Sequence, residues 1–269
     1  MNRIRAIFSK QNRALLSELV RTDFKLRYQG SVLGYLWSLL RPLLLFMILY
    51  LVFVKFLKIG SDVPNYPVYL LFGIVVWNFF VETTMQSLGS IVGRGDLIRK
   101  IRIPRWMIVL STSLNAVINL LLNILVIAVF MILGHVPLTI SALWLPLLFI
   151  EIYLFAFGVS LLLAALFVKY RDISYIWEVM LQAGFYATPV LYPLSRIKNI
   201  PIKTIMLFNP LGQALQDARY CLVTKATEIP SQVFTKSWFE VVPFIVVIIF
   251  LVVGILYFKK ESKFFAENI

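Results

Sequence analysis

The chain has 269 residues, of which 60% are hydrophobic, and a formal net charge of +13. With a mean hydropathy of +0.86, a water-soluble domain of this length would expose more apolar surface than soluble proteins tolerate. The basic residues lie beside apolar stretches rather than on a polar domain. The positive charge therefore predicts contact with anionic lipid headgroups and argues against nucleic acid as a partner.

Residues 1–32 predict a cytoplasmic, amphipathic helix that lies at the membrane interface. This segment is too polar to be a secretory signal peptide. Its apolar residues recur at helical spacing and lie opposite a charged set. The apolar set is Leu15, Leu16, Leu19, Val20 and Phe24, and the charged set is Arg13, Glu18, Arg21 and Lys25. We expect residues 33–269 to form a single all-α membrane domain.

Six apolar stretches are long enough for spanning helices, which need about 20 residues. They are Leu33–Leu57, Tyr66–Val92, Met107–Leu133, Leu143–Val168, Ile173–Leu194 and Val241–Phe258. A seventh stretch, Leu207–Val223, carries Gln213, Gln216, Asp217 and Arg219 in its middle. We therefore expect it to lie at the interface or to enter the membrane only partway.

Lys and Arg residues gather in alternate flanks of these stretches: residues 1–32, the loop 93–106, Lys169 to Arg171, and the residues after Phe258. Because basic flanks stay in the cytoplasm, this pattern places both termini there and the segment 193–240 outside.

Arg41 lies about nine residues into the first stretch and precedes Pro42. A charged residue in hydrocarbon costs roughly 2.5–3.5 kcal/mol on insertion scales. Arg41 must therefore reach the interface, contact a partner within the protein, or bind a phosphate group of a substrate.

Polar residues within three spans recur every four positions, so each set forms a stripe on one helix face. The stripes are Asn78, Glu82 and Gln86; Ser111, Asn115, Asn119 and Asn123; and Glu178, Gln182 and Tyr186. Such stripes either hold helices together or line a hydrated path. For Glu82 the hydrated path is favoured, because a carboxyl in hydrocarbon is costly unless it is paired or hydrated.

The loop 93–106 predicts a short helix, Leu97–Ile103, with Asp96 as its N-cap and Pro104 after its end. It is either a solvated basic turn or a docking element whose exposed Leu97, Ile98 and Ile101 enter a groove on a partner. Further on, Pro189 and Pro193 break the fifth span near its outer end. Asn209 and Pro210 then restart a helix as cap and first residue, which predicts a re-entrant outer gate.

Sequence signals for catalysis are absent. The chain has no GxxxxGK[ST] phosphate loop. Glu82, Glu151, Glu178 and Glu240 lie on four different segments without a catalytic motif. Cys221 is the single cysteine and His135 the single histidine, which excludes an internal disulfide and argues against a histidine-rich metal site.

Several of these segments together resemble a known family. They are residues 23–43 (DFKLRYQGSVLGYLWSLLRPL), Leu97 to Trp106, Tyr170 to Asp172, Thr188 to Tyr192, and Asn209 to Leu211. In this order they resemble the permeases of type-2 ABC exporters for cell-surface polysaccharides, which include the O-antigen, capsule and teichoic-acid families. The resemblance covers almost the whole chain.

The resemblance implies a homodimer of six-span subunits in a bacterial plasma membrane, with two separate cytoplasmic ATPase subunits. ATP and Mg would bind to those partners, and this chain would bind no cofactor and no metal. The cargo would be a glycan on polyprenyl diphosphate, which moves through a channel at the dimer interface. The loop would be a coupling helix, with Asp96, Leu97, Ile98, Arg99, Ile101 and Arg102. The outer gate would include Pro189, Tyr192, Pro193, Asn209 and Pro210.

Residue chemistry suggests where such a cargo would bind. Lys25, Arg27 and Arg41 are candidates for holding the diphosphate. The faces of aromatic rings suit the C–H side of sugar rings, although aromatic residues in spans often only pack or anchor. The channel-lining candidates are Tyr35, Trp37, Trp77, Phe80, Phe185, Tyr186, Glu82, Asn115 and Asn119.

Other functions remain open at this point. The same architecture would serve a drug or small-lipid exporter. A membrane-embedded glycosyl- or acyltransferase is disfavoured by the missing acid/base pair, and a non-transporting scaffold is a further alternative.

Overall fold

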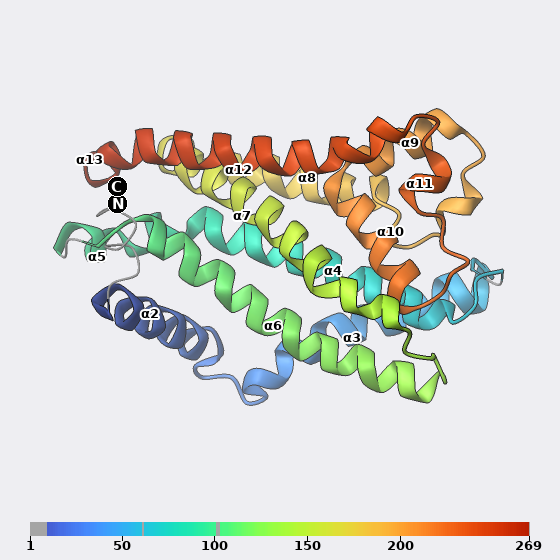
Figure 1. The fold of residues 1–269 in the computed structure, drawn as a ribbon. Coiled ribbons are helices and arrows are strands. Elements are labelled where there is room, and N and C mark those ends of the chain that lie inside the picture. Colours follow the sequence, from blue (N-terminus) through green and yellow to red (C-terminus); the bar gives the residue numbers. More distant parts are fainter. Residues whose placement is uncertain (1–9, 61, 101–102, 269) are drawn as a thin grey trace.

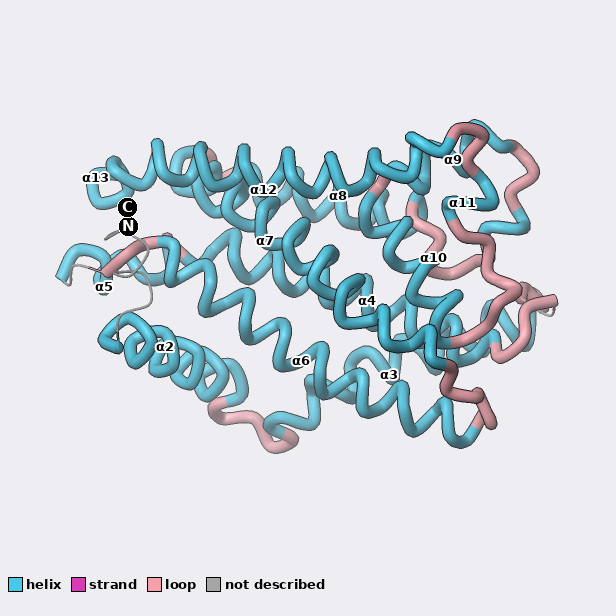
Figure 2. The backbone as a smooth tube through the Cα atoms, viewed as in Figure 1, coloured by secondary structure: helices cyan, strands magenta, loops and turns pink. Residues whose placement is uncertain are grey.

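A computed structural model describes residues 10–60, 62–100 and 103–268. In this part of the chain all regular secondary structure is helical (Figures 1 and 2). The helices form an elongated bundle. The short helices α5 (Gly95–Lys100) and α13 (Phe265–Asn268) lie at one end, and α9 (Ile200–Phe208) and α11 (Pro230–Val233) lie at the other (Figure 1). We call these the α5 end and the α9 end.

Five helical segments are long and apolar enough to cross a membrane: Gly34–Phe56, Tyr66–Ser90, Trp106–Leu133, Ile140–Lys169 and Ser237–Phe264. Their main helices are α3 (Trp37–Leu49), α4 (Tyr66–Ser90), α6 (Trp106–Leu133), α7 (Leu145–Lys169) and α12 (Val242–Glu261). A π-helical turn, Tyr50–Phe56, continues α3. Five of the six predicted spans are thus confirmed as membrane-length helices, and the chain is a multi-pass membrane protein.

The remaining predicted span is shorter than expected. Helix α8 (Ile173–Ala187) has 15 residues, which correspond to about 22 Å against a hydrocarbon thickness of about 30 Å. It ends because Thr188 is extended, with φ −94° and ψ 141°, the conformation that a following proline imposes. The predicted boundary at Leu194 is therefore wrong.

The predicted N-terminal helix is present as α2 (Lys10–Tyr28). It packs along the half of α6 nearest the α5 end (Figure 1). The five apolar residues of its predicted face are half-buried, and Arg13, Glu18, Arg21 and Lys25 are exposed. The amphipathic pattern thus describes the contact with α6, and the position of α2 at a membrane interface stays a prediction.

The predicted amphipathic stretch Leu207–Val223 is instead divided between α9 and α10 (Pro210–Leu222). Asn209 caps α10 and accepts a hydrogen bond from the Leu211 backbone N at 3.1 Å, with Pro210 as the first residue, as predicted. The expectation that this segment lies at the interface or enters the membrane only partway stays a prediction, but its polar residues are covered by protein. Gln213, Gln216 and Arg219 are 2%, 0% and 0% exposed, because α10 packs against α4 and α7.

Helix α4 is the centre of the bundle. Most of its residues are buried, as expected for a helix surrounded by others. Helices α7 and α12 cross closely at Gly158 and Gly254, where a Cβ added to Gly158 would lie 2.7 Å from the Leu251 backbone N. Small residues allow such close backbone approach in membranes.

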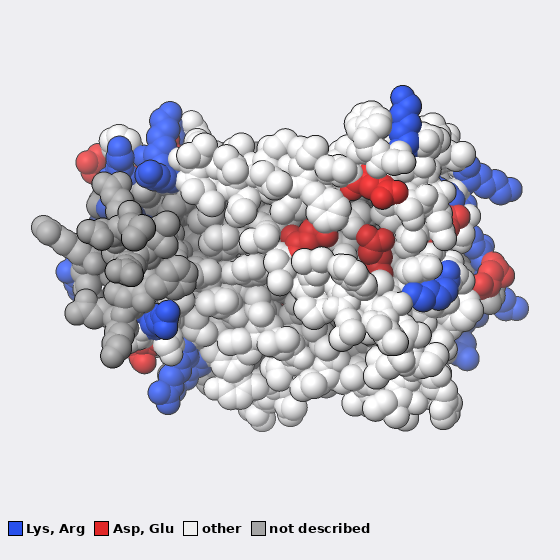
Figure 3. Space-filling model, in the orientation of Figure 1, with Lys and Arg blue, Asp and Glu red and all other residues white. Residues whose placement is uncertain are grey.

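The visible surface has a broad belt without basic residues between two charged ends (Figure 3). Acidic side chains interrupt this belt over α7 and α10. Glu151, which is 7% exposed, and Asp217 interact electrostatically. Burial raises the pKa of Asp217 to about 6, with Glu240 adding to the effect.

Candidate functional site

One cavity of about 1000 Å³ lies between α3, α4, α6 and α8. Its size is at the upper limit of ordinary ligand pockets. Its wall combines apolar and aromatic side chains with a set of polar ones. The polar and charged residues that line it are Ser31, Ser38, Arg41, Asn78, Glu82, Gln86, Asn119, Asn123, Glu178 and Gln182.

The stripe predicted on α4 lies entirely in this wall. Asn78, Glu82 and Gln86 all line the cavity, because their spacing of four places them on one helix face. The Glu82 carboxylate accepts hydrogen bonds from Gln86 Nε2, at 2.9 Å, and from Asn119 Nδ2 on α6. The carboxylate is therefore held in the wall by two amide donors.

The stripe predicted on α6 lies only partly in the cavity wall. Ser111 and Asn115 are buried away from the cavity, whereas Asn119 and Asn123 line it. Asn123 Nδ2 also donates to the backbone O of Ser38 on α3 at 3.2 Å. Asn119 and Asn123 thus face the cavity and also join α6 to α4 and α3, whereas Ser111 joins α6 to α2.

Helix α8 contributes the third predicted stripe, and Glu178, Gln182 and Tyr186 all line the cavity. Phe185 and Tyr186 belong to an aromatic group with Trp77 of α4, whose ring centroid lies 5.6 Å from that of Phe185. Gly184 allows this contact, since a Cβ there would lie 2.9 Å from the Trp77 ring. Trp37 of α3 completes the predicted aromatic residues in the wall.

Arg41 is exposed and lines the cavity from α3. The predicted basic cluster is only partly formed. Lys25 is exposed on α2 and does not line the cavity, and the side chain of Arg27 lies outside the described part of the structure. Among the described side chains of this predicted cluster, Arg41 lines the cavity and Lys25 does not.

Three predicted channel residues lie elsewhere. The Phe80 ring is buried against Phe155, with centroids 5.6 Å apart, because α4 and α7 pack face to face there. Tyr35 stacks on Phe24 of α2 at 4.9 Å. Asn115 is 3% exposed, and its Oδ1 has no hydrogen-bond partner among the described residues. These three residues do not line the cavity, and their predicted place along a channel between two subunits stays a prediction.

The short helix predicted in the loop 93–106 is present as α5, but it begins at Gly95, so Asp96 lies in its first turn and does not precede it. Arg99 is exposed, whereas Leu97 and Ile98 are half-buried. Ile98 packs on a cluster that includes Ile91 and Ile108, so the expectation that it is exposed is wrong. Ile101 and Arg102 lie outside the described residues.

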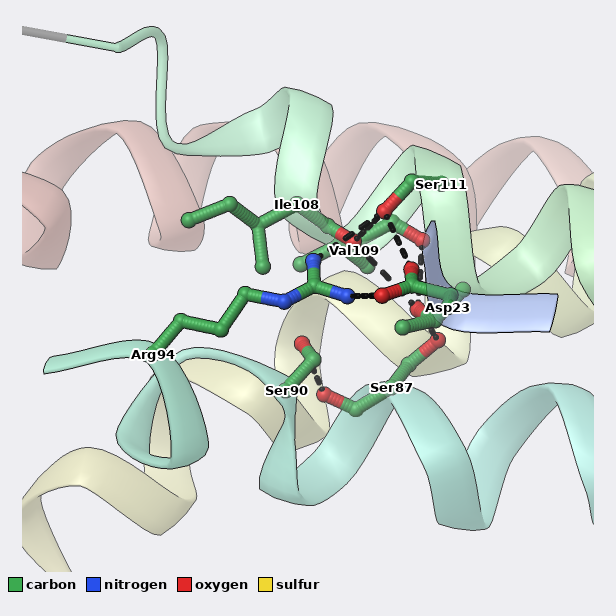
Figure 4. A network of polar contacts seen from close by, with 8 residues as sticks. Asp23, Ser87, Ser90, Arg94, Ile108, Val109 and Ser111 are labelled. Atoms are coloured by element: carbon green, nitrogen blue, oxygen red, sulfur yellow. Dashed lines mark hydrogen bonds and ion pairs between the residues drawn. The ribbon is translucent and has the colours of Figure 1, made fainter. Parts of the chain in front are cut away.

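A polar network joins the start of α5 to α2 and α6 (Figure 4). Arg94 forms an ion pair with Asp23 of α2 and donates to Ser111 Oγ at 3.1 Å. Ser111 Oγ in turn donates to Asp23 Oδ2 at 3.1 Å. The base of α5 is therefore linked to the N-terminal helix and to α6 by one group of side chains.

The predicted gate residues lie together at the α9 end. Pro189, Pro193 and Pro210 are buried, and Tyr192 and Asn209 are half-buried. Asn209 Nδ2 reaches Thr188 Oγ1 at 3.4 Å, and the Tyr192 hydroxyl donates to the backbone O of Tyr186 at 2.7 Å. At this end of the bundle, the gate residues belong to a packed structure that continues directly from α8.

Comparison with known proteins identifies the family. Residues 14–223 match the ABC-2 type transporter family. Two proteins from Klebsiella pneumoniae called O-antigen export system permease protein RfbA are similar. One is 34% identical over 202 residues, which cover 75% of this chain and 77% of the relative. The other is 30% identical over 254 residues, 94% of each. A Myxococcus xanthus protein of the same name is 32% identical over 203 residues, 75% of this chain and 77% of the relative.

This chain belongs to the ABC-2 type transporter family. The match begins in α2 and ends directly after α10. It therefore includes all the residues that line the cavity, as well as α5 and the packed turn at the α9 end. The resemblance on which the sequence-based prediction depended is confirmed.

Some residues of this ABC-2 transporter site were not predicted. Ser38 lines the cavity one helical turn before Arg41, and that spacing of three is a signal the sequence offered. Arg219, in contrast, is fully buried although it lies in a polar stretch, and no local pattern indicates this. Among the described residues, no group of three or more His, Cys, Asp or Glu residues is placed to hold a metal ion.

Proposed function

We propose that this chain is the membrane-spanning permease subunit of an ATP-driven exporter. Its cargo would be a lipid-linked polysaccharide, a polyprenyl-diphosphate glycan such as O-antigen or teichoic acid. One observation carries this proposal: the polar stripes of three helices and Arg41 meet in one large cavity within an apolar bundle. The relatives named as O-antigen permeases supply the class of cargo.

The wall chemistry suits a glycan. Asn, Gln and Glu side chains replace the water that sugar hydroxyls bind, and Trp37, Trp77 and Tyr186 offer ring faces for the C–H side of sugars. Arg41 offers a guanidinium fork that matches phosphate oxygens. We infer that Arg41 contacts the diphosphate and that the amide-rich wall contacts the sugars.

Two copies would complete the path. Helix α8 presents large exposed apolar residues, including Tyr175, Ile176, Val179 and Met180, and has only Leu181 buried. A second subunit packed against this face of α8 would lie directly beside the cavity. We infer a homodimer in which the two cavities face a common channel.

The proposed topology has six spans with both termini in the cytoplasm of a bacterium. Helix α8 and the turn after it would form the fifth span. Helices α9 and α10 would form a re-entrant outer segment, since irregular backbone at membrane depth needs protein around it. The basic residues near α2, α5 and α12 support the cytoplasmic position of the α5 end.

ATP and Mg would bind on two partner ATPase subunits below the α5 end. Helix α5 would transmit their motion, and the network of Arg94, Asp23 and Ser111 would carry it to α2 and α6. This chain would then supply the path, and the partners would supply the energy.

Substitution of Arg41 tests the proposal. The chain is co-expressed with the ATPase that co-purifies with it and reconstituted in vesicles with lipid-linked glycan. Arg41→Ala should lower the rate of ATP-dependent export at least tenfold, because the diphosphate loses its charged partner, while membrane insertion and complex assembly stay unchanged.

Lys55→Ala is the matched control, since Lys55 is an exposed basic residue on the same spanning segment that does not line the cavity. It should export at the wild-type rate. Wild-type export by Arg41→Ala would remove Arg41 from the cargo path. Failure of the chain to bind any ATPase would contradict the proposed function itself.

A further inference from the structure

Arg219 of α10 is fully buried, with 0% of its surface exposed. Its guanidinium donates to three backbone carbonyls that come from distant parts of the chain. Nε donates to Tyr69 O of α4 at 3.1 Å, Nη2 to Val190 O at 2.7 Å, and Nη1 to Pro189 O. One side chain thus joins α10, α4 and the turn that follows α8.

Neighbouring residues shape this site for a planar cation. The guanidinium lies over the Tyr69 ring, 3.6 Å from its centroid, an arrangement that favours arginine over lysine. Gln216 Oε1 accepts from Arg219 Nη1 at 3.3 Å and from the Tyr69 hydroxyl at 3.2 Å. A Cβ added to Gly73 would overlap Arg219 Nη2, so glycine is needed for the close approach.

The partners of Arg219 explain why a charge is tolerated there. Pro189 and Val190 belong to an irregular turn whose carbonyls have left the helix, and buried carbonyls without donors are costly. The fork of Arg219 supplies donors to two consecutive carbonyls at once. The Tyr66 hydroxyl also donates to Leu191 O, so the whole turn is fastened to the first turns of α4.

The turn controls the outer end of α8. It starts at Thr188, directly after the last helical residue, Ala187. Helix α8 is otherwise exposed, and near its start Trp177 Nε1 donates to Thr84 Oγ1 of α4 at 3.1 Å. Phe185 and Tyr186, which line the cavity, lie at the end of α8 that the turn holds.

We propose that Arg219 is a positioning residue for translocation, which fixes the outer end of α8 against α4 and so sets the position of Phe185 and Tyr186 in the cavity wall. This role rests on the proposed function. Arg219 lies outside the cavity, but in this role it controls the position of the part of the cavity wall that is nearest the α9 end. Loss of the fork should free that end of α8 while the contact near its start remains.

Spin labels on α8 test the position directly in the full complex. In a Cys221→Ser background, one label is placed at Ala187→Cys, near the turn, and another at Tyr175→Cys, near the start of α8. Both positions are exposed in the single chain, and Tyr175 lies in the face of α8 proposed to contact the second subunit, so its label reports whether that contact is kept. Arg219→Met should increase label mobility at position 187 and leave it unchanged at 175. Unchanged mobility at both positions, or an equal increase at both, would overturn the proposal.

Export per ATP hydrolysed gives the functional readout. Arg219→Met should lower this ratio at least fivefold, and Arg219→Lys should not restore it, because an ammonium group cannot span two carbonyls and stack on Tyr69. Arg196→Met is the matched control, since Arg196 is an exposed arginine near the same end, paired with Asp62 at 3.3 Å. The control should keep the wild-type ratio.

A third variant keeps the test decisive if Arg219→Met does not fold. Gly73→Ala retains the arginine but crowds both its guanidinium and the Val190 backbone O that the guanidinium binds, so it should reproduce the change in mobility at position 187. Wild-type mobility and wild-type coupling in both Gly73→Ala and Arg219→Lys would refute the role of the fork. Absence of export by the wild-type complex would instead contradict the proposed function, because label mobility is measured without transport.

Discussion

Glu82 and Glu151 are both acidic residues within spanning helices, but their surroundings differ. Glu82 lines the cavity and accepts two hydrogen bonds from amide side chains. Glu151 is 7% exposed, and its Oε1 has no hydrogen-bond partner among the described residues. A carboxyl that accepts hydrogen bonds in the cavity wall suggests a role in the cargo path. A buried carboxyl oxygen without a hydrogen-bond partner instead lowers stability.

Leucine at each position separates the two roles. Glu82→Leu should lower export at least tenfold, because it removes the acceptor of two amide donors and makes the wall apolar. Glu151→Leu should leave the export rate unchanged and keep or raise the thermal unfolding temperature. Vesicle export assays and thermal unfolding in detergent check both outcomes. Equal export by the two variants would contradict the assignment of Glu82 to the path.

Residue spacing predicted much of this site. Polar residues four apart must share a helix face, so spacing alone was enough to predict the stripes of α4 and α8 correctly. The role of Arg219 could not be predicted, because its hydrogen bond to Tyr69 O joins residues 150 positions apart. Phe80 shows the opposite error, since an aromatic residue in a span looks the same whether it faces a cavity or a neighbouring helix.

The crossing of α7 and α12 shows how backbone contact holds two helices together. A Cβ added to Gly254 would overlap the backbone O of Gly158, whereas one added to Gly89 of α4 would have no neighbour within 4 Å. Gly254→Ala should therefore destabilise the membrane domain by about 1–3 kcal/mol, as overpacking does.

Gly89→Ala is the control for this prediction. It should be neutral or stabilising by up to about 1 kcal/mol, because alanine is a better helix former than glycine. Unfolding of the purified chain in mixed micelles gives both free energies of unfolding. A Gly254→Ala variant as stable as Gly89→Ala would show that the two helices separate without cost.

The positions of helices could be predicted from the sequence where the length and apolar content of a stretch are enough to identify a spanning helix. Five spans agree with their predicted limits within a few residues at most ends. The end of α8 and the division into α9 and α10 depend on where the backbone of Thr188 and Asn209 leaves the helical conformation. The prolines that follow them indicated both breaks, but not that the buried turn would be stabilised by donors from other helices.

The whole molecule combines an apolar belt, a cavity with polar side chains in its wall, and a polar network at the α5 end that joins α2, α5 and α6. The cavity is lined by helices from the first half of the chain and by α8, whereas α7 and α10 pack behind α4 and α12 packs on α7. This division predicts that modification inside the cavity blocks export and that modification of the outer face of α12 does not.

Blocking the cavity chemically tests the central claim most directly. In a Cys221→Ser background, Tyr186→Cys places a thiol in the cavity wall, and Ile249→Cys places one on the exposed face of α12. Both complexes are reacted with a bulky maleimide and assayed for ATP-dependent export of lipid-linked glycan in vesicles. The labelled Tyr186→Cys complex should lose export while the labelled Ile249→Cys complex retains it. Full export after complete labelling at position 186 would show that the glycan does not pass through this cavity.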